Sequence, residues 1–253
     1  MPLSKLIKAA DRVWSRITAR TKHDDRDIVF FMPVFKDAPV AFAALSRIRR
    51  FYPTSRVVLL SDGDPSFPGA EAAEKFGVEY ILADNAYAIS DGGRLIHRML
   101  THYMQAPAKY LLRIDTDARL DRRFAWLPGR TGLYGRIGER SGTAQGGCVL
   151  FTHDAAAKLF GERTFESPKL LQPETSWGRF STPENLQRKL AQGRIAYDKV
   201  LHWGCVEAGV PVRPFGEIFS LWLPKPEHAA SLANADRRYA VVHPDKEMTS
   251  LPN

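Results

Sequence analysis

The sequence predicts an α/β protein in which a mostly parallel sheet is covered by helices on both faces. Short, nearly all-apolar runs rich in β-branched and aromatic residues alternate with segments of helical periodicity. Such runs are typical of strands buried on both sides. The chain has 253 residues, of which 44% are hydrophobic and 25% charged, enough for one large core. We therefore expect a single domain with short extensions.

Residues 1–22 are expected to form a basic amphipathic helix that precedes this domain. Between residues 3 and 20, apolar side chains recur at helical spacing, and lysines and arginines largely occupy the positions between them. A helix of this kind can lie on an anionic membrane surface, and it can equally pack on protein. The sequence leaves these two alternatives open.

The first strand is predicted over residues 28–35, a nearly all-apolar run that follows a charged break. A helix comes next, because Asp37 can cap it and Pro39 fits its first turn. The helix continues to a Tyr-Pro pair that ends it. The second buried strand, residues 56–60, ends in a turn-forming cluster at 61–65.

The same alternation continues to about residue 114. The next elements are a helix over 70–76, a strand over 78–82, a helix over 93–104 and a strand over 110–114. Strands that alternate with helices imply βαβ units and hence a largely parallel sheet. Because ligands bind at the carboxyl ends of such strands, segments 33–37, 61–64 and 115–119 are expected to face the ligand.

Past residue 125 the pattern changes. Glycine crowds residues 129–147, and 149–151 resemble one more strand. Residues 161–185 are rich in Pro, Ser, Thr and Gly and are expected to form a loop, in which Trp177 and Phe180 either stack on a ligand or belong to the core. Later segments are predicted helices over 184–190 and 198–208, the stretch 240–246 and a polar tail at 247–253.

Charge and cysteine usage narrow the class of protein. The formal net charge of +8 suits nucleic acid, anionic lipid or a phosphorylated substrate, but the cations are scattered, so no nucleic-acid partner is expected. Cys148 and Cys205 stand alone and are expected to be buried thiols. The first 25 residues lack a signal-peptide core. We therefore expect a cytoplasmic protein, attached peripherally to the inner face of the membrane if residues 3–20 bind lipid.

Asp115-Thr116-Asp117 is the leading candidate site. Three D-x-D patterns occur, but this one directly follows the predicted strand 110–114, so both carboxylates project where a parallel sheet presents ligands. A divalent cation relieves the repulsion between two such carboxylates, and Mg²⁺ or Mn²⁺ is commonly bound through carboxylates and diphosphate oxygens. The alternative is a strand-end turn with two solvated acids.

The order of these motifs resembles a known enzyme class. Met32-Pro33-Val34-Phe35 ends the first strand, Leu60-Ser61-Asp62-Gly63 ends the second, and Tyr110 to Asp117 closes the series. Together they are similar to the GT-A-fold glycosyltransferases, nearest to their family-2-like group. The resemblance spans residues 27–246. It implies a Rossmann-like nucleotide-sugar-binding half over 27–120 and an acceptor-binding half over 121–246.

The resemblance implies roles in the donor half. The nucleotide would lie against the end of the first strand, at Pro33, Val34 and Phe35. Asp62 would hydrogen-bond the base, unless it is only a turn acid, and Arg94 would lie near the base or the diphosphate, unless it is a surface cation. Asp115 would contact the ribose, the metal or a metal-bound water, and Asp117 would ligate the metal directly.

It also implies roles in the second half. Asp198 matches the acid that serves as general base in inverting members, although Tyr197 stands where Glu is usual, and a plain helix N-cap is the alternative. His243 would complete the metal shell, which favours manganese, and Lys246 would contact the diphosphate. The segment 144–147, which has no side chain at Gly146 and Gly147, would let the acceptor or sugar approach the backbone closely.

The implied activity is metal-dependent transfer of a sugar from a nucleotide-diphospho-sugar to a hydroxyl of a glycan or lipid-linked glycan, as in polysaccharide biosynthesis. A UDP-sugar is the expected donor, with a GDP-sugar as the alternative, and inversion is expected if Asp198 is the base. The competing interpretations are a retaining transferase that uses the same DTD and histidine, a sugar-nucleotide nucleotidyltransferase of the same fold, and a basic membrane- or nucleic-acid-binding module. The nucleotidyltransferase is disfavoured because no G-x-G-T-R pattern follows the first strand.

Overall fold

The computed structural model describes residues 22–84, 92–138, 143–166, 197–220 and 238–243. Several sequence expectations lie outside these residues, namely the helices at 1–22 and 184–190, the side chains of Trp177 and Phe180, and Lys246. None of the described helices has the length and apolar character that crossing a bilayer requires.

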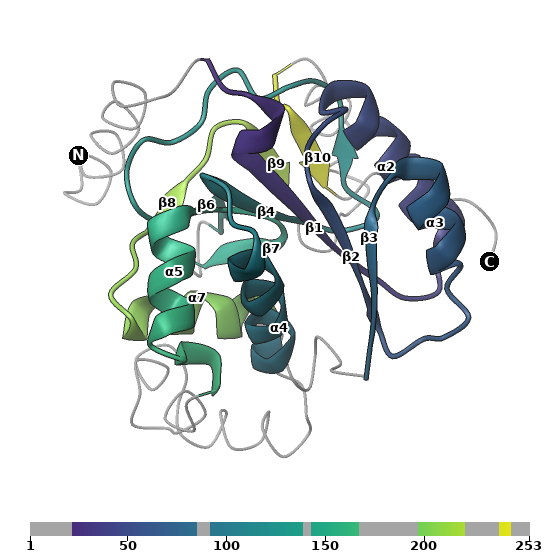
Figure 1. The fold of residues 1–253 in the computed structure, drawn as a ribbon. Helices are drawn as coiled ribbons and strands as arrows, with labels where there is room; N and C mark the ends of the chain where they lie inside the picture. Colours follow the sequence, from purple (N-terminus) through teal and green to yellow (C-terminus); the bar gives the residue numbers. More distant parts are fainter. Residues whose placement is uncertain (1–21, 85–91, 139–142, 167–196, 221–237, 244–253) are drawn as a thin grey trace.

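The core of the fold is a seven-stranded sheet in the order β3-β2-β1-β4-β7-β6-β8 (Figure 1). Its strands are β1 (Ile28–Val34), β2 (Val57–Asp62), β3 (Glu79–Ala83), β4 (Tyr110–Ile114), β6 (Leu133–Ile137), β7 (Ala144–Thr152) and β8 (Val212–Pro214). Neighbouring strands are parallel except that β7 runs antiparallel to both β4 and β6. The prediction of a mostly parallel sheet is confirmed.

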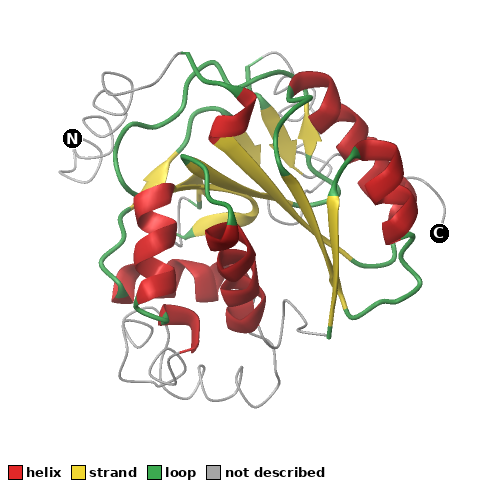
Figure 2. Ribbon diagram, viewed as in Figure 1, coloured by secondary structure: helices red, strands yellow, loops and turns green. Residues whose placement is uncertain are grey.

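Helices cover both faces of the sheet (Figure 2). One face carries α2 (Ala38–Phe51) and α3 (Gly69–Phe76); the other carries α4 (Gly92–Gln105), α5 (His153–Gly161) and α7 (Tyr197–Glu207). Strand β1 is apolar throughout because both of its faces are buried. Ile28, Phe30 and Met32 pack with the α2 side, whereas Val29 and Phe31 pack with the α4 side.

A second sheet of three short strands joins distant parts of the chain. It has the order β5-β10-β9, with β5 at Arg119–Leu120, β9 at Ile218–Ser220 and β10 at Val241–His243. Strand β10 pairs antiparallel with β5 and parallel with β9. Because β5 begins two residues after Asp117, this pairing carries His243 to the DTD turn.

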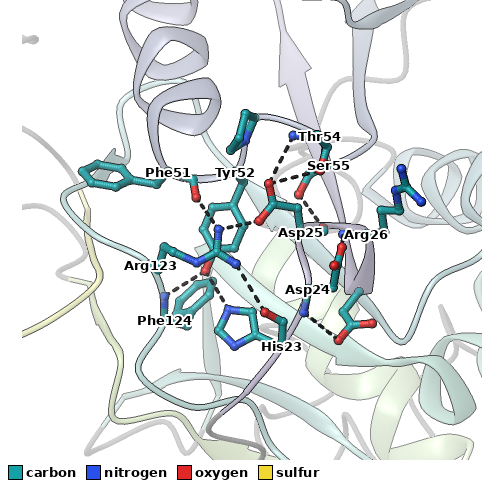
Figure 3. A network of polar contacts seen from close by, with 12 residues as sticks. His23, Asp24, Asp25, Arg26, Phe51, Tyr52, Thr54, Ser55, Arg123 and Phe124 are labelled. Carbon is teal, nitrogen blue, oxygen red and sulfur yellow. Dashed lines mark hydrogen bonds and ion pairs between the residues drawn. The ribbon is translucent and has the colours of Figure 1, made fainter.

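The start of the described chain is fixed by the polar cluster in Figure 3. Asp25–Asp27 form a 3-10 helix before β1. Arg123 pairs with the Asp25 carboxylate, donates to the carbonyl of Phe51 at 2.6 Å, and lies 4.5 Å from the centroid of the Tyr52 ring. The cluster therefore ties the segment before β1 to the end of α2 and to the loop after β5, at the edge of the sheet where the strands begin.

Several details differ from the sequence expectations. Strand β2 runs through Ser61 and Asp62, which were expected to belong to the turn after it. Asp37 stands at the N-cap of α2, but its side chain makes no capping hydrogen bond. The strand expected at 149–151 is the end of a longer one, β7, and the helix expected at 198–208 begins and ends one residue earlier. The glycines of β7 conceal its length, because glycine is depleted in strands generally.

Candidate active site

Asp115, Thr116 and Asp117 form a tight turn directly after β4, called the DTD turn below. The backbone N–H of Asp115 donates to the carbonyl of Gly147 at 2.8 Å, and the carbonyl of Asp115 accepts the N–H of Ala118 at 3.1 Å. Strand β7, antiparallel to β4, thus begins beside the point where β4 ends. The turn holds the two partly buried carboxylates at the carboxyl edge of the parallel strands.

The ring of His243 faces both carboxylates. Its Nε2 lies 3.2 Å from Oδ1 of Asp117 and 3.6 Å from Oδ2 of Asp115. Its Nδ1 lies 2.9 Å from the hydroxyl of Ser220, the residue that pairs with it across β9 and β10. The three side chains offer ligand atoms within 4.8 Å of one another and so could hold a metal ion.

Two glycines at the start of β7 make this assembly possible. A Cβ at Gly147 would lie 2.1 Å from the His243 ring, so no other residue type leaves room for it. A Cβ at Gly146 would lie 2.9 Å from the ring of Tyr197 and 3.1 Å from the Cβ of Asp198. The close approach expected at residues 144–147 is therefore made by the protein's own side chains.

The electrostatic surroundings of Asp117 favour its ionised form. Burial raises the pKa of this carboxyl, but the hydrogen bond and the charge of His243 outweigh burial, and the net shift of the pKa is downward. An anionic Asp117 beside an imidazole is a combination that suits a transition-metal cation.

Asp198 lies in the first turn of α7, on the Gly146 side of β7. Its Oδ1 accepts the N–H of Lys199 at 3.1 Å. The pKa of Asp198 is raised, chiefly because burial disfavours the charged form. Gly147 thus contacts the DTD turn and His243, while its neighbour Gly146 contacts the start of α7, so the candidate base and the candidate metal ligands flank one short segment.

The residues expected to bind the nucleotide lie on the same edge of the sheet. Strands β1 and β2 end in register, with Pro33 paired to Leu60 and Val34 paired to Ser61. Phe35 follows β1 with 43% of its surface exposed. Asp62 is the last residue of β2, and Gly63 after it has a φ of 79°, which favours glycine.

Arg94 lies apart from the DTD turn in the contacts that the structure describes. It stands in the first turn of α4 and pairs with Asp84 at 3.1 Å, as Arg98 also does with the same carboxylate. This ion pair follows the end of β3, at the outer strand of the sheet.

Sequence reasoning assigned no role to Arg113, which contacts both halves of the site. Its guanidinium lies 2.6 Å from Oδ1 of Asp115, donates to the carbonyl of Gly146, and lies 4.5 Å from the centroid of the Tyr197 ring. Only 5% of its surface is exposed. The available signal was its charge, since every other residue of β4 is apolar or aromatic.

Comparison with known proteins yields matches of structure only. No protein-family model and no curated protein sequence matches this chain. Crystal structures of the glycosyltransferase GlyE from Streptococcus pneumoniae TIGR4 do match, one with a TM-score of 0.51 at 10% identity and its apo form with 0.54 at 11%. Each match covers 87% of this chain and 54% of the other, so this chain spans about half the length of the proteins it matches. At this identity the likeness concerns the fold alone, a Rossmann-like α/β fold that this chain shares with GlyE.

Proposed function

We propose that this chain is a metal-dependent glycosyltransferase, which moves a sugar from a nucleotide-diphospho-sugar to a hydroxyl acceptor. The observation that carries the proposal is the convergence of Asp115, Asp117 and His243 at the carboxyl edge of the sheet. The shared fold with a glycosyltransferase supports it. In α/β sheets this edge is where ligands bind.

The side chains fit a divalent cation. Two carboxylates and one imidazole form a mixed oxygen and nitrogen set, which suits Mn²⁺ better than Mg²⁺. Gly147 leaves the space that the His243 ring occupies, and Ser220 can accept a hydrogen bond from Nδ1–H, which would leave the lone pair of Nε2 directed at the carboxylates. When bound, the cation would act as a Lewis acid on the diphosphate leaving group.

The donor would lie across the ends of β1 and β2. The register of these strands supports a nucleotide lined by Pro33, Val34 and Phe35, with Asp62 at the base. Lys246 would contact the diphosphate three residues after His243, and Arg94 would approach the nucleotide only by leaving Asp84. We expect a UDP-sugar, with a GDP-sugar as the alternative. Contact of residues 3–20 with an anionic membrane stays a prediction.

Asp198 would act as the general base. Because burial raises its pKa, its carboxylate is more basic than that of an exposed aspartate. It would take the proton of the acceptor hydroxyl as that oxygen attacks the anomeric carbon and the bond from this carbon to the diphosphate oxygen breaks. Because Asp198 would deprotonate the acceptor and would not itself attack the anomeric carbon, we expect a single displacement that inverts the configuration of this carbon.

Turnover of a panel of UDP- and GDP-sugars, measured as release of the nucleotide with and without Mn²⁺, tests this proposal. We expect turnover with Mn²⁺ and none in EDTA. Asp117→Asn should lower Mn²⁺-dependent turnover at least 100-fold, because the variant loses the negative charge of a carboxylate that would bind the cation beside His243.

Asp154→Asn is the matched control, because Asp154 is exposed and lies beyond the opposite end of β7. This variant should turn over like the wild type. Full turnover in EDTA, or equal activity of Asp117→Asn and Asp154→Asn, would refute the metal site.

A further inference from the structure

Arg113 is a buried cation inside a strand of the core. Strand β4 lies between β1 and β7, and Arg113 pairs with Phe31 on one side and Val149 on the other. Burying a charge costs several kcal/mol unless it is paired and hydrogen-bonded. Arg113 is neither a candidate metal ligand nor the candidate base, and no contact with the donor is proposed for it. Another role must therefore explain why a charged residue is buried here.

Three partners surround the guanidinium, and they belong to different parts of the site. One terminal nitrogen binds Oδ1 of Asp115 at 2.6 Å, which leaves Oδ2 of that carboxylate on the side of His243. The other terminal nitrogen donates to the carbonyl of Gly146. The face of the guanidinium lies over the ring of Tyr197, at 4.5 Å from the centroid.

These partners connect the candidate metal ligands with the candidate base. Asp115 belongs to the candidate metal ligands, whereas Tyr197 directly precedes the candidate base and opens α7. Tyr197 is itself buried, with 7% of its surface exposed, and its ring packs where a Cβ of Gly146 would be. A shift of the guanidinium would therefore change the contacts both at the DTD turn and at the first turn of α7.

We propose that Arg113 is a positioning residue that holds the Asp115 carboxylate and the first turn of α7 in one fixed arrangement. This inference rests on the proposed function, because it concerns the relative placement of the metal ligands and of Asp198. Arg113 acts through Asp115 and Tyr197 and is not assigned any contact with the donor or the acceptor.

The three contacts explain why the residue is arginine. A planar guanidinium binds two acceptors in its plane and stacks on a ring with its face, whereas the ammonium of lysine is a compact point charge. Lysine at position 113 would keep a cation beside Asp115 but would not hold Gly146 and Tyr197 at the same time. The substitution therefore separates charge balance at the metal site from alignment of α7.

Arg113→Lys tests the inference through kcat, the KM for the donor, and the Kd for Mn²⁺ measured by electron paramagnetic resonance. We expect kcat to fall at least tenfold, while the donor KM and the Mn²⁺ Kd stay within threefold of the wild type. A smaller loss of kcat, or a Mn²⁺ Kd changed by more than threefold, would overturn the inference.

Arg56→Lys is the matched control. Arg56 is mostly buried just before β2, where it binds both carboxylate oxygens of Glu79, at 2.7 and 2.8 Å, and two backbone carbonyls at the end of α4. It lies at the opposite edge of the sheet from the DTD turn. Its replacement should lower stability but leave kcat within threefold of the wild type, so it shows what loss of a structural arginine does by itself. A fall of kcat equal to that of Arg113→Lys would mean that Arg113 is merely structural.

Tyr197→Leu keeps the test decisive if Arg113→Lys folds poorly, and the two substitutions form a double-mutant cycle where both variants fold. Tyr197→Leu leaves the Arg113–Asp115 pair in place and should show the same fall in kcat with an unchanged Mn²⁺ Kd. If the two residues act as one unit, the double variant should lose no more than threefold beyond either single variant. Additive losses would overturn the inference. A wild-type protein that neither binds Mn²⁺ nor turns over a nucleotide-sugar would instead refute the proposed function, and this inference with it.

Discussion

At the scale of single residues, the site depends on small side chains as much as on charged ones. His243 reaches the carboxylates only because position 147 has no Cβ, and Asp198 packs against position 146 for the same reason. The sequence predicted the histidine, the aspartate and the glycines as parts of the site. It could not predict that the glycines make room for the protein's own rings, because that depends on how β10 and α7 meet β7 in space.

Asp198→Asn should stabilise the protein while abolishing turnover. The pKa of Asp198 is raised in the folded state, so its stabilising contribution is present at low pH and is lost as the pH rises through the folded pKa. At neutral pH the buried carboxylate is therefore a cost that a neutral amide removes. We expect a higher Tm by differential scanning calorimetry, where ~1 kcal/mol corresponds to roughly 2–4 °C.

The same group should set the acidic limb of the pH profile. Turnover needs the ionised base, so kcat should fall as the pH drops through a pKa above the ordinary 3.8 of an aspartate. A variant Asp198→Asn that loses stability, or that keeps wild-type turnover, would contradict the assignment of Asp198 as a buried base.

At the scale of elements, the polar cluster around Asp25 and Arg123 holds the segment before β1 against the rest of the domain. Asp25 is mostly buried and receives hydrogen bonds from Arg123 and from the N–H and hydroxyl of Thr54. Burial raises the pKa of Asp25, but these bonds outweigh it and lower the pKa overall. The stability that the cluster contributes is therefore present at neutral pH and is lost as the pH falls through the lowered pKa.

Arg123→Met should lower the free energy of unfolding by about 2 kcal/mol at neutral pH, because it leaves a mostly buried carboxylate without its cation. Urea denaturation measures this loss, which should shrink at acidic pH. Arg50→Met is the control, since Arg50 is exposed at the end of α2, and it should change the free energy by less than about 0.5 kcal/mol. Equal losses in the two variants would mean that the cluster contributes nothing specific.

Elements with an unbroken apolar pattern could be predicted from the sequence, whereas β7 was predicted only near its end and α5 and most of the short strands were not predicted. Helix α2 and strand β4 have the predicted bounds because the apolar periodicity of the first and the apolar run of the second are unambiguous. Strands β5, β9 and β10 have two or three residues each and carry too little pattern. These short strands nonetheless bring His243 to Asp117, so the geometry of the candidate site depends on the part of the fold with the weakest sequence signal.

At the scale of the whole molecule, the likeness to a solved structure supports the fold, whereas the side-chain geometry supports the proposed site. The sheet order and the likeness to GlyE concern the fold of a chain about half as long as its match. The proposed activity depends on the carboxylates, the imidazole and the buried acid that this fold brings together. The net charge of +8 contributes little, since specificity for a nucleotide-sugar would come from placed residues and a cation.

A thermal-shift screen of nucleotide-sugars, with Mn²⁺ or with EDTA, tests whether this chain binds a nucleotide-sugar through a metal ion. A ligand present at 100 times its Kd stabilises the folded state by about 2.7 kcal/mol, which corresponds to a rise in Tm of roughly 5–11 °C for a protein of this size. We predict such a rise for one class of nucleotide-diphospho-sugar, only with Mn²⁺, and its loss in Asp117→Asn. If no nucleotide-sugar raised the Tm with Mn²⁺, or if the rise were as large in EDTA, the site would not be a metal-dependent nucleotide-sugar site.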